Sequence, residues 1–112
     1  MTSTELVEIY ADAWRKLDAK IVEPYLDEFF KYSSFWVFET LDREKYIEYL
    51  SGKFSAIKSS NTAPAVSTGY DKTGSPCVIL KQGNGAPACI TVRTNCDKIV
   101  EGYMIPFSIV CG

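Results

Sequence analysis

The sequence contains no histidine. This absence excludes a Ser-His-Asp triad, a Cys-His dyad and an H-E-x-x-H zinc site, because each of them needs an imidazole. A catalytic base would have to be an Asp, Glu, Tyr, Lys or Cys side chain. A carboxylate works well as a base near neutral pH only when a dry pocket raises its pKa. Acid–base chemistry in this chain therefore requires an enclosed apolar cavity.

Long apolar runs and basic clusters are also missing from the sequence. No apolar stretch approaches the ~20 residues that span a bilayer, and the opening MTSTELVE lacks the basic and apolar regions of a signal peptide. The formal net charge of −2 comes without any run of Lys or Arg that could bind phosphates. We therefore expect no nucleic-acid partner, no membrane partner and a cytoplasmic location.

The cysteines offer no metal site. Cys77, Cys89, Cys96 and Cys111 form no C-x-x-C pair, and their spacing matches no zinc ribbon or finger. Without a signal peptide, we expect reduced thiols that pack as small apolar side chains. No metal and no other cofactor is expected.

The chain has the size and composition of one globular domain. It has 112 residues, of which 46% are hydrophobic and 23% charged, so we expect residues 1–112 to form a single domain. Thr2 and Glu5 have the spacing of a capping box at the start of a helix. A stripe of apolar residues at helical period follows the capping box: Leu6, Ile9, Tyr10, Ala13, Trp14 and Leu17.

The next segments predict a short helix and a strand. Asp18 is expected to cap the short helix, which Pro24 breaks or restarts. The aromatic-rich stretch FFKYSSFWVFE, residues 29–39, predicts the strand. By period 2, its even-numbered face carries Phe30, Tyr32, Ser34, Trp36 and Phe38, and its odd-numbered face carries Lys31, Ser33, Phe35, Val37 and Glu39. The pattern leaves open which face lines an interior.

A long helix and a run of strands complete the prediction. Asp42 should cap a helix that continues to about Lys58, with a buried stripe formed by Ile47, Leu50, Phe54 and Ile57. Turn signals then separate strands at residues 65–70, 77–81, 88–94 and 99–106, with residues 107–111 as a terminal extension. This order describes an α+β domain with its helices gathered on one face of a bent sheet. Because the strands carry more apolar residues than one covered face can bury, we also expect a homodimer through the sheet.

Two segments resemble a known superfamily. AWRKLDAKIVEPYLDEFFKYSSFW and ITVRTNCDKIVEGYMIP are similar to the opening and the penultimate hairpin of the nuclear transport factor 2-like superfamily, in particular its polyketide-cyclase-like (SnoaL-like) and ketosteroid-isomerase-like branches. The resemblance implies a cystatin-like α+β cone. In this cone, three N-terminal helices pack in the concave face of a strongly curved, mostly antiparallel sheet, in the order α-α-β-α-β-β-β-β. The open end of such a cone often holds a small apolar molecule.

The ketosteroid-isomerase-like branch can be compared residue by residue. Its mechanism uses a carboxylate that moves a proton, while a tyrosine and a protonated aspartate hold the enolate oxygen. The resemblance puts Tyr10 at the tyrosine position, but the base position falls near Ser33 and the protonated-acid position near Cys89. A serine without a base accepts a proton poorly, and a thiol is a weak donor. Steroid isomerisation by the usual route is therefore not expected.

Three function classes remain open. The first is a domain that binds a small apolar or amphipathic molecule in the mouth of the cone. The second is an isomerase, dehydratase or cyclase in which Glu39 or Glu101 is the base and a tyrosine such as Tyr10 stabilises the oxyanion. The third is a dimerisation or adaptor module without a ligand. We favour the first, with these candidate ligand-binding residues: Tyr10, Trp14, Tyr32, Ser33, Ser34, Trp36, Cys89 and Tyr103.

Several candidates also have a purely structural interpretation. Glu39 fits an exposed loop carboxylate, and Glu101 fits a cross-strand ion pair with Arg93. Tyr10 and Trp14 fit a packed core. A cavity with a buried carboxylate would favour the enzyme, and one with only hydroxyls and indoles would favour binding. A filled cone with an apolar outer face would favour the adaptor.

Overall fold

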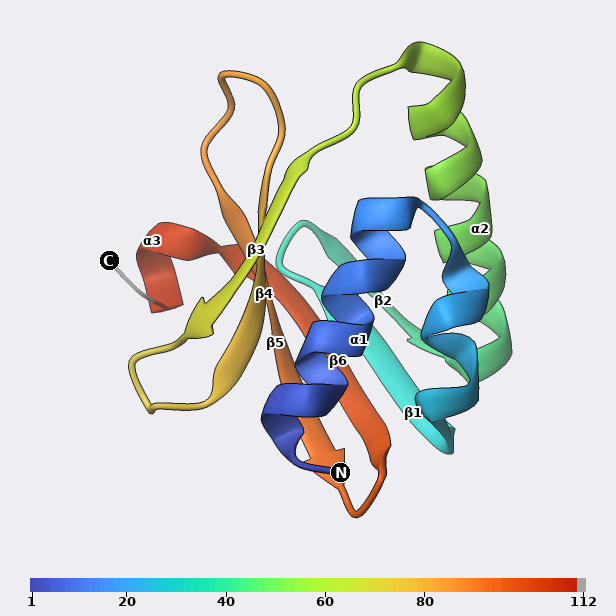
Figure 1. Cartoon of the computed structure of the whole chain (residues 1–112), viewed down its shortest axis with the longest axis vertical. Helices are drawn as coiled ribbons and strands as arrows, with labels where there is room; N and C mark the ends of the chain where they lie inside the picture. The colour runs from blue at the N-terminus through green and yellow to red at the C-terminus, as the bar shows by residue number, and fades with distance from the viewer. Residues whose placement is uncertain (111–112) are drawn as a thin grey trace.

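The computed structural model describes residues 1–110, which form one sheet with two long helices on one of its faces (Figure 1). The elements are α1 (Ser3–Lys16), the 3₁₀ turns η1 (Ala19–Ile21) and η2 (Glu23–Tyr25), β1 (Leu26–Ser34), β2 (Val37–Asp42), α2 (Arg43–Ser60), β3 (Ala65–Tyr70), β4 (Pro76–Lys81), β5 (Ala88–Asn95), β6 (Lys98–Pro106) and α3 (Phe107–Val110). The predicted α+β class is confirmed. The sheet is twisted but not strongly curled, unlike the strongly curved sheet that we expected (Figure 1).

The sheet has six strands in the order β2-β1-β6-β5-β4-β3. All neighbouring strands are antiparallel except β1 and β6, which are parallel, so the sheet is mixed. The predicted strands after residue 60 are confirmed to within one residue at each end. The predicted ion pair also forms, because Arg93 and Glu101 are register partners and Arg93 Nη2 lies 2.8 Å from Glu101 Oε2.

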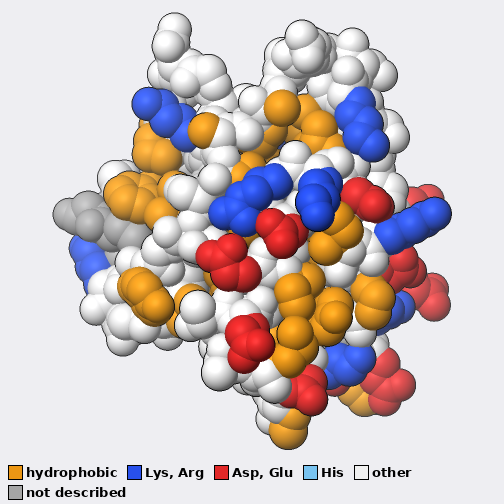
Figure 2. Space-filling view, viewed as in Figure 1, with side chains coloured by type: hydrophobic (Ala, Val, Ile, Leu, Met, Phe, Trp, Pro, Cys, Tyr) orange, Lys and Arg blue, Asp and Glu red, His pale blue; other side chains and the backbone are white. Residues whose placement is uncertain are grey.

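Helix α1 begins with the predicted capping box. The Thr2 hydroxyl accepts from the Glu5 backbone N–H at 3.1 Å, and the Glu5 carboxylate accepts from the Thr2 N–H at 3.0 Å. The helix ends at Leu17, which has a left-handed φ of 52°. On its exposed face, Arg15 forms ion pairs with Asp12 and Glu8, and acidic and basic side chains lie close together there in Figure 2. The buried residues of α1 are Leu6, Val7, Tyr10, Ala11, Ala13 and Trp14.

The segment after α1 is broken at Pro24, as predicted. The Asp18 carboxylate caps η1 by accepting from the Lys20 N–H at 3.0 Å, and Pro24 lies in the first turn of η2. The result is two short 3₁₀ turns in place of one helix. The guanidinium of Arg43 fixes the exit of this segment, because it donates to the carbonyls of Glu23 and Leu26 at 2.9 and 3.2 Å.

The single strand predicted for residues 29–39 is wrong. The chain turns at Phe35 and Trp36, and Ser34 pairs with Val37, so β1 and β2 form an antiparallel hairpin. The Ser34 hydroxyl accepts from the Trp36 N–H at 3.3 Å and so stabilises the turn from the preceding residue. Phe35 and Trp36 are consequently 48% and 55% exposed. On β1 the even-numbered side faces the helices, where Phe30 and Tyr32 are buried.

Helix α2 begins at the predicted cap. The Asp42 carboxylate accepts from the Lys45 N–H at 2.9 Å, and the helix ends at Asn61, which has a left-handed φ of 55°. The buried residues of α2 are Tyr46, Leu50, Phe54 and Ile57. The predicted stripe omitted Tyr46 and instead contained Ile47, which is only partly buried.

Apolar side chains pack on both faces of the sheet. The main core lies between α1, α2 and the sheet. On the other face, Cys77, Cys89 and Ile105 are buried, and Ile79, Tyr103 and Phe107 pack partly exposed around them. We call these six residues the outer cluster. The residues predicted as a terminal extension form α3 up to Val110, with the Phe107 N–H donating to the Pro87 carbonyl at 3.0 Å, whereas Cys111 lies outside the described residues.

No helix within residues 1–110 is long and apolar enough to cross a membrane.

The main core is held by aromatic contacts such as that of Phe54 with Trp14, whose ring centroids lie 5.0 Å apart in an edge-to-face arrangement.

Replacing Phe54 by Ala should lower the free energy of unfolding by about 3–5 kcal/mol, because the substitution opens a cavity at the centre of the core. The matched control is Phe29→Ala. Phe54 is 2% exposed and Phe29 75% exposed, so the control should change stability by less than about 0.5 kcal/mol. Urea unfolding monitored by circular dichroism measures both changes, and equal losses would contradict this description of the core.

Candidate functional site

Four tyrosines form a continuous cluster between the helices and β1, which we call the tyrosine cluster: Tyr10 from α1, Tyr32 from β1, and Tyr46 and Tyr49 from α2. Tyr32 stacks on Tyr46 with ring centroids 4.5 Å apart and on Tyr49 at 5.9 Å. Exposure rises along the cluster from 0% at Tyr10 to 40% at Tyr49. The cluster therefore connects the centre of the core with solvent.

Each buried phenol in the cluster needs a hydrogen-bond partner. The hydroxyls of Tyr10 and Tyr46 are hydrogen-bonded to each other across the gap between α1 and α2. Gly102 of β6 lies against this pair, and a Cβ added there would be 3.4 Å from both the Tyr10 hydroxyl oxygen and Phe30 Cζ. The Tyr10 hydroxyl therefore lies close to the backbone of β6.

The three buried phenols of the tyrosine cluster, Tyr10, Tyr32 and Tyr46, keep their protons at neutral pH. Burial raises the pKa of Tyr10 and of Tyr46 well above the ordinary value. Burial also raises the pKa of Tyr32, with a further increase from the Tyr49 phenol and an opposing effect of the Ser34 hydroxyl. These groups can donate hydrogen bonds, but they do not supply an anionic base near pH 7.

A pocket of about 130 Å³ lies where the C-terminal part of α1 meets α2 and the β4–β5 hairpin. We call it the end pocket. Figure 2 shows a notch at this end of the molecule between the β4–β5 hairpin and the end of α2, with hydrophobic side chains at its base. Its lining residues are Trp14, Lys53, Pro64, Leu80, Gln82, Ala86, Ala88 and Met104. Most of this lining is apolar, and among these residues only Lys53 is charged.

Two hydrogen-bond donors of the end pocket lack acceptors within the described chain. The Trp14 side chain is 3% exposed, and its indole N–H has no hydrogen-bond partner there. Lys53 is partly buried, forms none of the ion pairs found in residues 1–110, and has its Nζ 6.0 Å from the centre of the Tyr49 ring. The end pocket thus carries unmet donor capacity and no negative charge of its own.

The structure brings some of the predicted ligand-binding residues together and separates others. Trp14 lines the end pocket, while Tyr10 and Tyr32 are packed in the tyrosine cluster. Ser34 is the register partner of Met104, which lines the pocket. Ser34 therefore lies beside Met104, but it is not itself a lining residue. The other candidates lie elsewhere: Ser33 is paired with Tyr103, Tyr103 and Cys89 belong to the outer cluster, and Trp36 is at the exposed turn.

Neither candidate carboxylate reaches these aromatic groups. Glu39 is exposed on β2, and Glu101 pairs with Arg93. No Asp or Glu is among the lining residues of the end pocket. In the part of the chain that the structure describes, no group of three or more Cys, Asp or Glu side chains could hold a metal ion.

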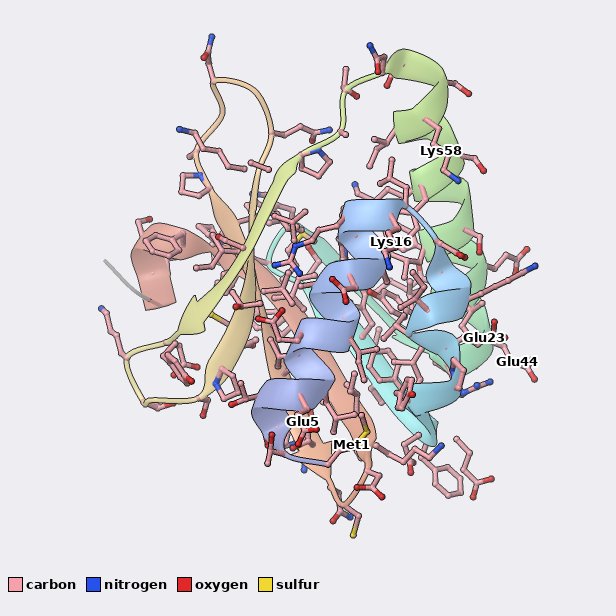
Figure 3. The ribbon with its side chains drawn as sticks, in the orientation of Figure 1. Met1, Glu5, Lys16, Glu23, Glu44 and Lys58 are labelled. Atoms are coloured by element: carbon pink, nitrogen blue, oxygen red, sulfur yellow. The ribbon has the colours of Figure 1, made fainter. Side chains whose placement is uncertain are left out.

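A larger, open concavity of about 740 Å³ lies around η2 and the start of α2. Its lining is polar, and Glu23 and Glu44 lie near each other at this edge of the molecule in Figure 3. Its two cations already serve the fold, because Arg43 donates to the Glu23 and Leu26 carbonyls and Lys98 donates to the Pro24 carbonyl at 2.7 Å. We therefore regard the end pocket as the better candidate site.

The sequence analysis did not predict three α2 residues of the tyrosine cluster and the end pocket: Tyr46, Tyr49 and Lys53. They follow one another at spacings of three and four residues, which puts them on one face of α2. The period was available in the sequence. The predicted stripe of Ile47, Leu50, Phe54 and Ile57 did not include these three positions.

Solved structures share this fold at low sequence identity. A SnoaL-like protein of unknown function from Burkholderia thailandensis is 14% identical, with a TM-score of 0.70 over 98% of this chain and 94% of that one. An NTF2-like protein of unknown function from Mesorhizobium loti is 14% identical, with a TM-score of 0.71 over 98% and 91%. A protein from Catenulispora acidiphila with a ketosteroid isomerase-like fold, solved in complex with trimethylamine, is 17% identical, with a TM-score of 0.63 over 93% and 86%.

No family model matches the chain, and no curated protein matches it. The structural similarities confirm the predicted resemblance at the level of the fold, which is NTF2-like and cystatin-like. At these identities they show the fold alone.

Replacing Tyr10 or Tyr46 by Phe should lower the free energy of unfolding by about 1–3 kcal/mol, because each change leaves the other buried hydroxyl without a partner. The double variant Tyr10→Phe/Tyr46→Phe should lose less than the sum of the two single changes, because it removes both hydroxyls. Chemical denaturation of the four proteins gives the coupling energy. Strictly additive losses would show that the two hydroxyls do not depend on each other.

Proposed function

We propose that the protein binds a small apolar or amphipathic molecule in the end pocket. The observation that carries this proposal is the lining, in which Leu80, Ala88 and Met104 of the sheet are combined with Trp14 and Lys53 of the two helices. Ligand pockets typically have mostly apolar walls and a few polar groups that fix the orientation of the ligand.

The volume sets the size of the ligand. A cavity of about 130 Å³ corresponds to roughly four water molecules at their share of liquid volume, ~30 Å³ each. A short alkyl chain or a single small ring fits this space, whereas a sterol would extend far outside it. The complex of a protein with a ketosteroid isomerase-like fold with trimethylamine supports a ligand of this size class.

The composition of the site favours binding over catalysis. An isomerase or dehydratase would need Glu39 or Glu101 next to the ligand, and neither residue lines the end pocket. Tyr10, Tyr32 and Tyr46 offer no base at neutral pH either, because burial raises their pKa values above that of an ordinary phenol, which is itself protonated there. Lys53 and the Trp14 N–H can hold a ligand, but the described lining offers no carboxylate for removing a proton from it.

A thermal-shift screen against small hydrophobic acids, small ketones and sterols tests this function. A ligand present at about 100 times its dissociation constant should raise the free energy of unfolding by about 2.7 kcal/mol. We expect stabilisation by small acids or ketones and none by sterols.

The variant Ala88→Leu should abolish the stabilisation, because the larger side chain fills the pocket. Ala65→Leu is the control, since Ala65 is exposed on β3 and does not line the pocket. Stabilisation that survives in Ala88→Leu would place the ligand elsewhere, and a screen without any stabilising compound would remove the proposal.

We also propose that the protein is a homodimer through the outer face of the sheet. The outer cluster leaves Ile79, Tyr103 and Phe107 partly exposed around buried Cys77 and Cys89. Ile109 of α3, which follows Phe107, adds a side chain that is 47% exposed. A second copy would cover this apolar surface, and C2 pairing through one shared patch is the commonest arrangement of soluble oligomers.

Light scattering during gel filtration at micromolar concentration should give twice the monomer mass. Ile79→Lys should give the monomer, because it puts an unpaired charge in the middle of the proposed interface. Glu48→Lys, on the exposed face of α2, is the control and should leave the dimer intact. A monomeric wild-type protein contradicts the proposal.

A further inference from the structure

Two residues that line the end pocket, Trp14 and Lys53, carry hydrogen-bond donors, and no residue of the lining is negatively charged. An ammonium group donates hydrogen bonds only, and so does an indole N–H. Lys53 and Trp14 both line the pocket, and within residues 1–110 neither the Lys53 ammonium has an ion-pair partner nor the Trp14 N–H an acceptor. A ligand that contributes acceptors alone, with a negative charge, would complement this site.

The rest of the lining defines the remainder of such a ligand. Leu80, Ala88 and Met104 project from adjacent strands β4, β5 and β6 and form an apolar floor, because Leu80 pairs with Ala88 and Met104 is the partner of Ile90, two residues further along β5. Pro64 and Ala86 add apolar walls. This floor suits an alkyl group or one ring of the size that about 130 Å³ allows.

Charged side chains of both signs lie near this end of the molecule, since Asp18 lines the same small surface pocket as Lys58. Lys16 at the end of α1 and Lys58 near the end of α2 both lie in the upper part of Figure 3, whereas Glu5, Glu23 and Glu44 lie in the lower part.

We propose that the end pocket binds a small monocarboxylate, with its carboxylate on Lys53 and its alkyl or aromatic group on Leu80, Ala88 and Met104. This inference rests on the proposed function of the pocket and narrows it to one class of ligand. The Trp14 side chain forms the wall next to the ligand, and a carboxylate oxygen is the acceptor that its indole N–H lacks.

The experiment compares two probes of matched shape and different charge, benzoate and its neutral isostere benzamide, and adds a small cation, trimethylammonium. The protein carries Trp36→Phe, so that Trp14 is the single remaining indole of the two in the sequence. The change is at an exposed turn, since Trp36 is 55% exposed. The readout is the Trp14 indole N–H resonance in a heteronuclear NMR titration, from which the dissociation constant of each probe follows.

Benzoate should bind at least about tenfold more tightly than benzamide, the factor expected for a hydrogen bond to a charged partner. Lys53→Met should remove this difference and leave the benzamide affinity unchanged. Lys45→Met is the matched control, because Lys45 is an exposed lysine of the same helix outside the pocket lining.

The possible failures are distinguishable. Equal binding of benzoate and benzamide, blocked by Ala88→Leu, overturns the carboxylate inference and leaves the small-molecule function standing. Tighter binding of trimethylammonium, or a benzoate preference that survives in Lys53→Met, overturns it as well. If no probe shifts the Trp14 resonance, the inference and the proposed function fall together.

Discussion

The hydrogen bond between Tyr10 and Tyr46 is the constraint around which the molecule is arranged. Both phenols are completely buried, so each hydroxyl depends on the other. Because one belongs to α1 and the other to α2, the bond fixes the separation of the two helices. The Tyr10 hydroxyl and the Phe30 ring also lie close to Gly102 of β6, so the sheet borders this arrangement.

This aromatic centre also determines where an empty space can remain. The rings of Phe30, Tyr32 and Tyr46 fill the region between β1 and the helices, with centroids about 5 Å apart. The end pocket therefore lies at the edge of the packed region, beside Trp14 and Met104, and not in the middle of the fold. The packing of these aromatic rings thus fills the centre of the fold and leaves the end pocket at its edge.

Local sequence patterns were sufficient to predict most helices and strands, but not the turn within the first predicted strand or the pairing of distant strands. The capping box at Thr2, the caps at Asp18 and Asp42 and the break at Pro24 depend on neighbouring residues, and all of them are present. The turn at Phe35 and Trp36 was missed, because its stabilising group is a serine hydroxyl and two aromatic residues do not indicate a turn. The parallel contact of β1 with β6 was missed as well, since no local pattern encodes a pairing between distant strands.

The same limit applies to the candidate site. Trp14 could be selected from the helical stripe, but its neighbours Lys53, Leu80, Ala88 and Met104 come from four other elements. Glu39 and Glu101 were reasonable candidates as the acidic residues of predicted strands. Their positions at the surface follow from the hairpin at residues 35–36 and from the cross-strand pairing with Arg93, and both features depend on tertiary structure.

The parallel pairing of β1 with β6 has a consequence for how the chain folds. Ser34 lies next to Met104 in the sheet, although 70 residues separate them in the sequence (104 − 34). Closing a loop of this length costs chain entropy before any contact is gained, and folds dominated by such distant pairings form slowly. During synthesis, the edge of β1 that faces away from β2 stays unpaired until β6 has left the ribosome. Until then the β1 edge of the hairpin has unpaired backbone groups, which favours association with other chains.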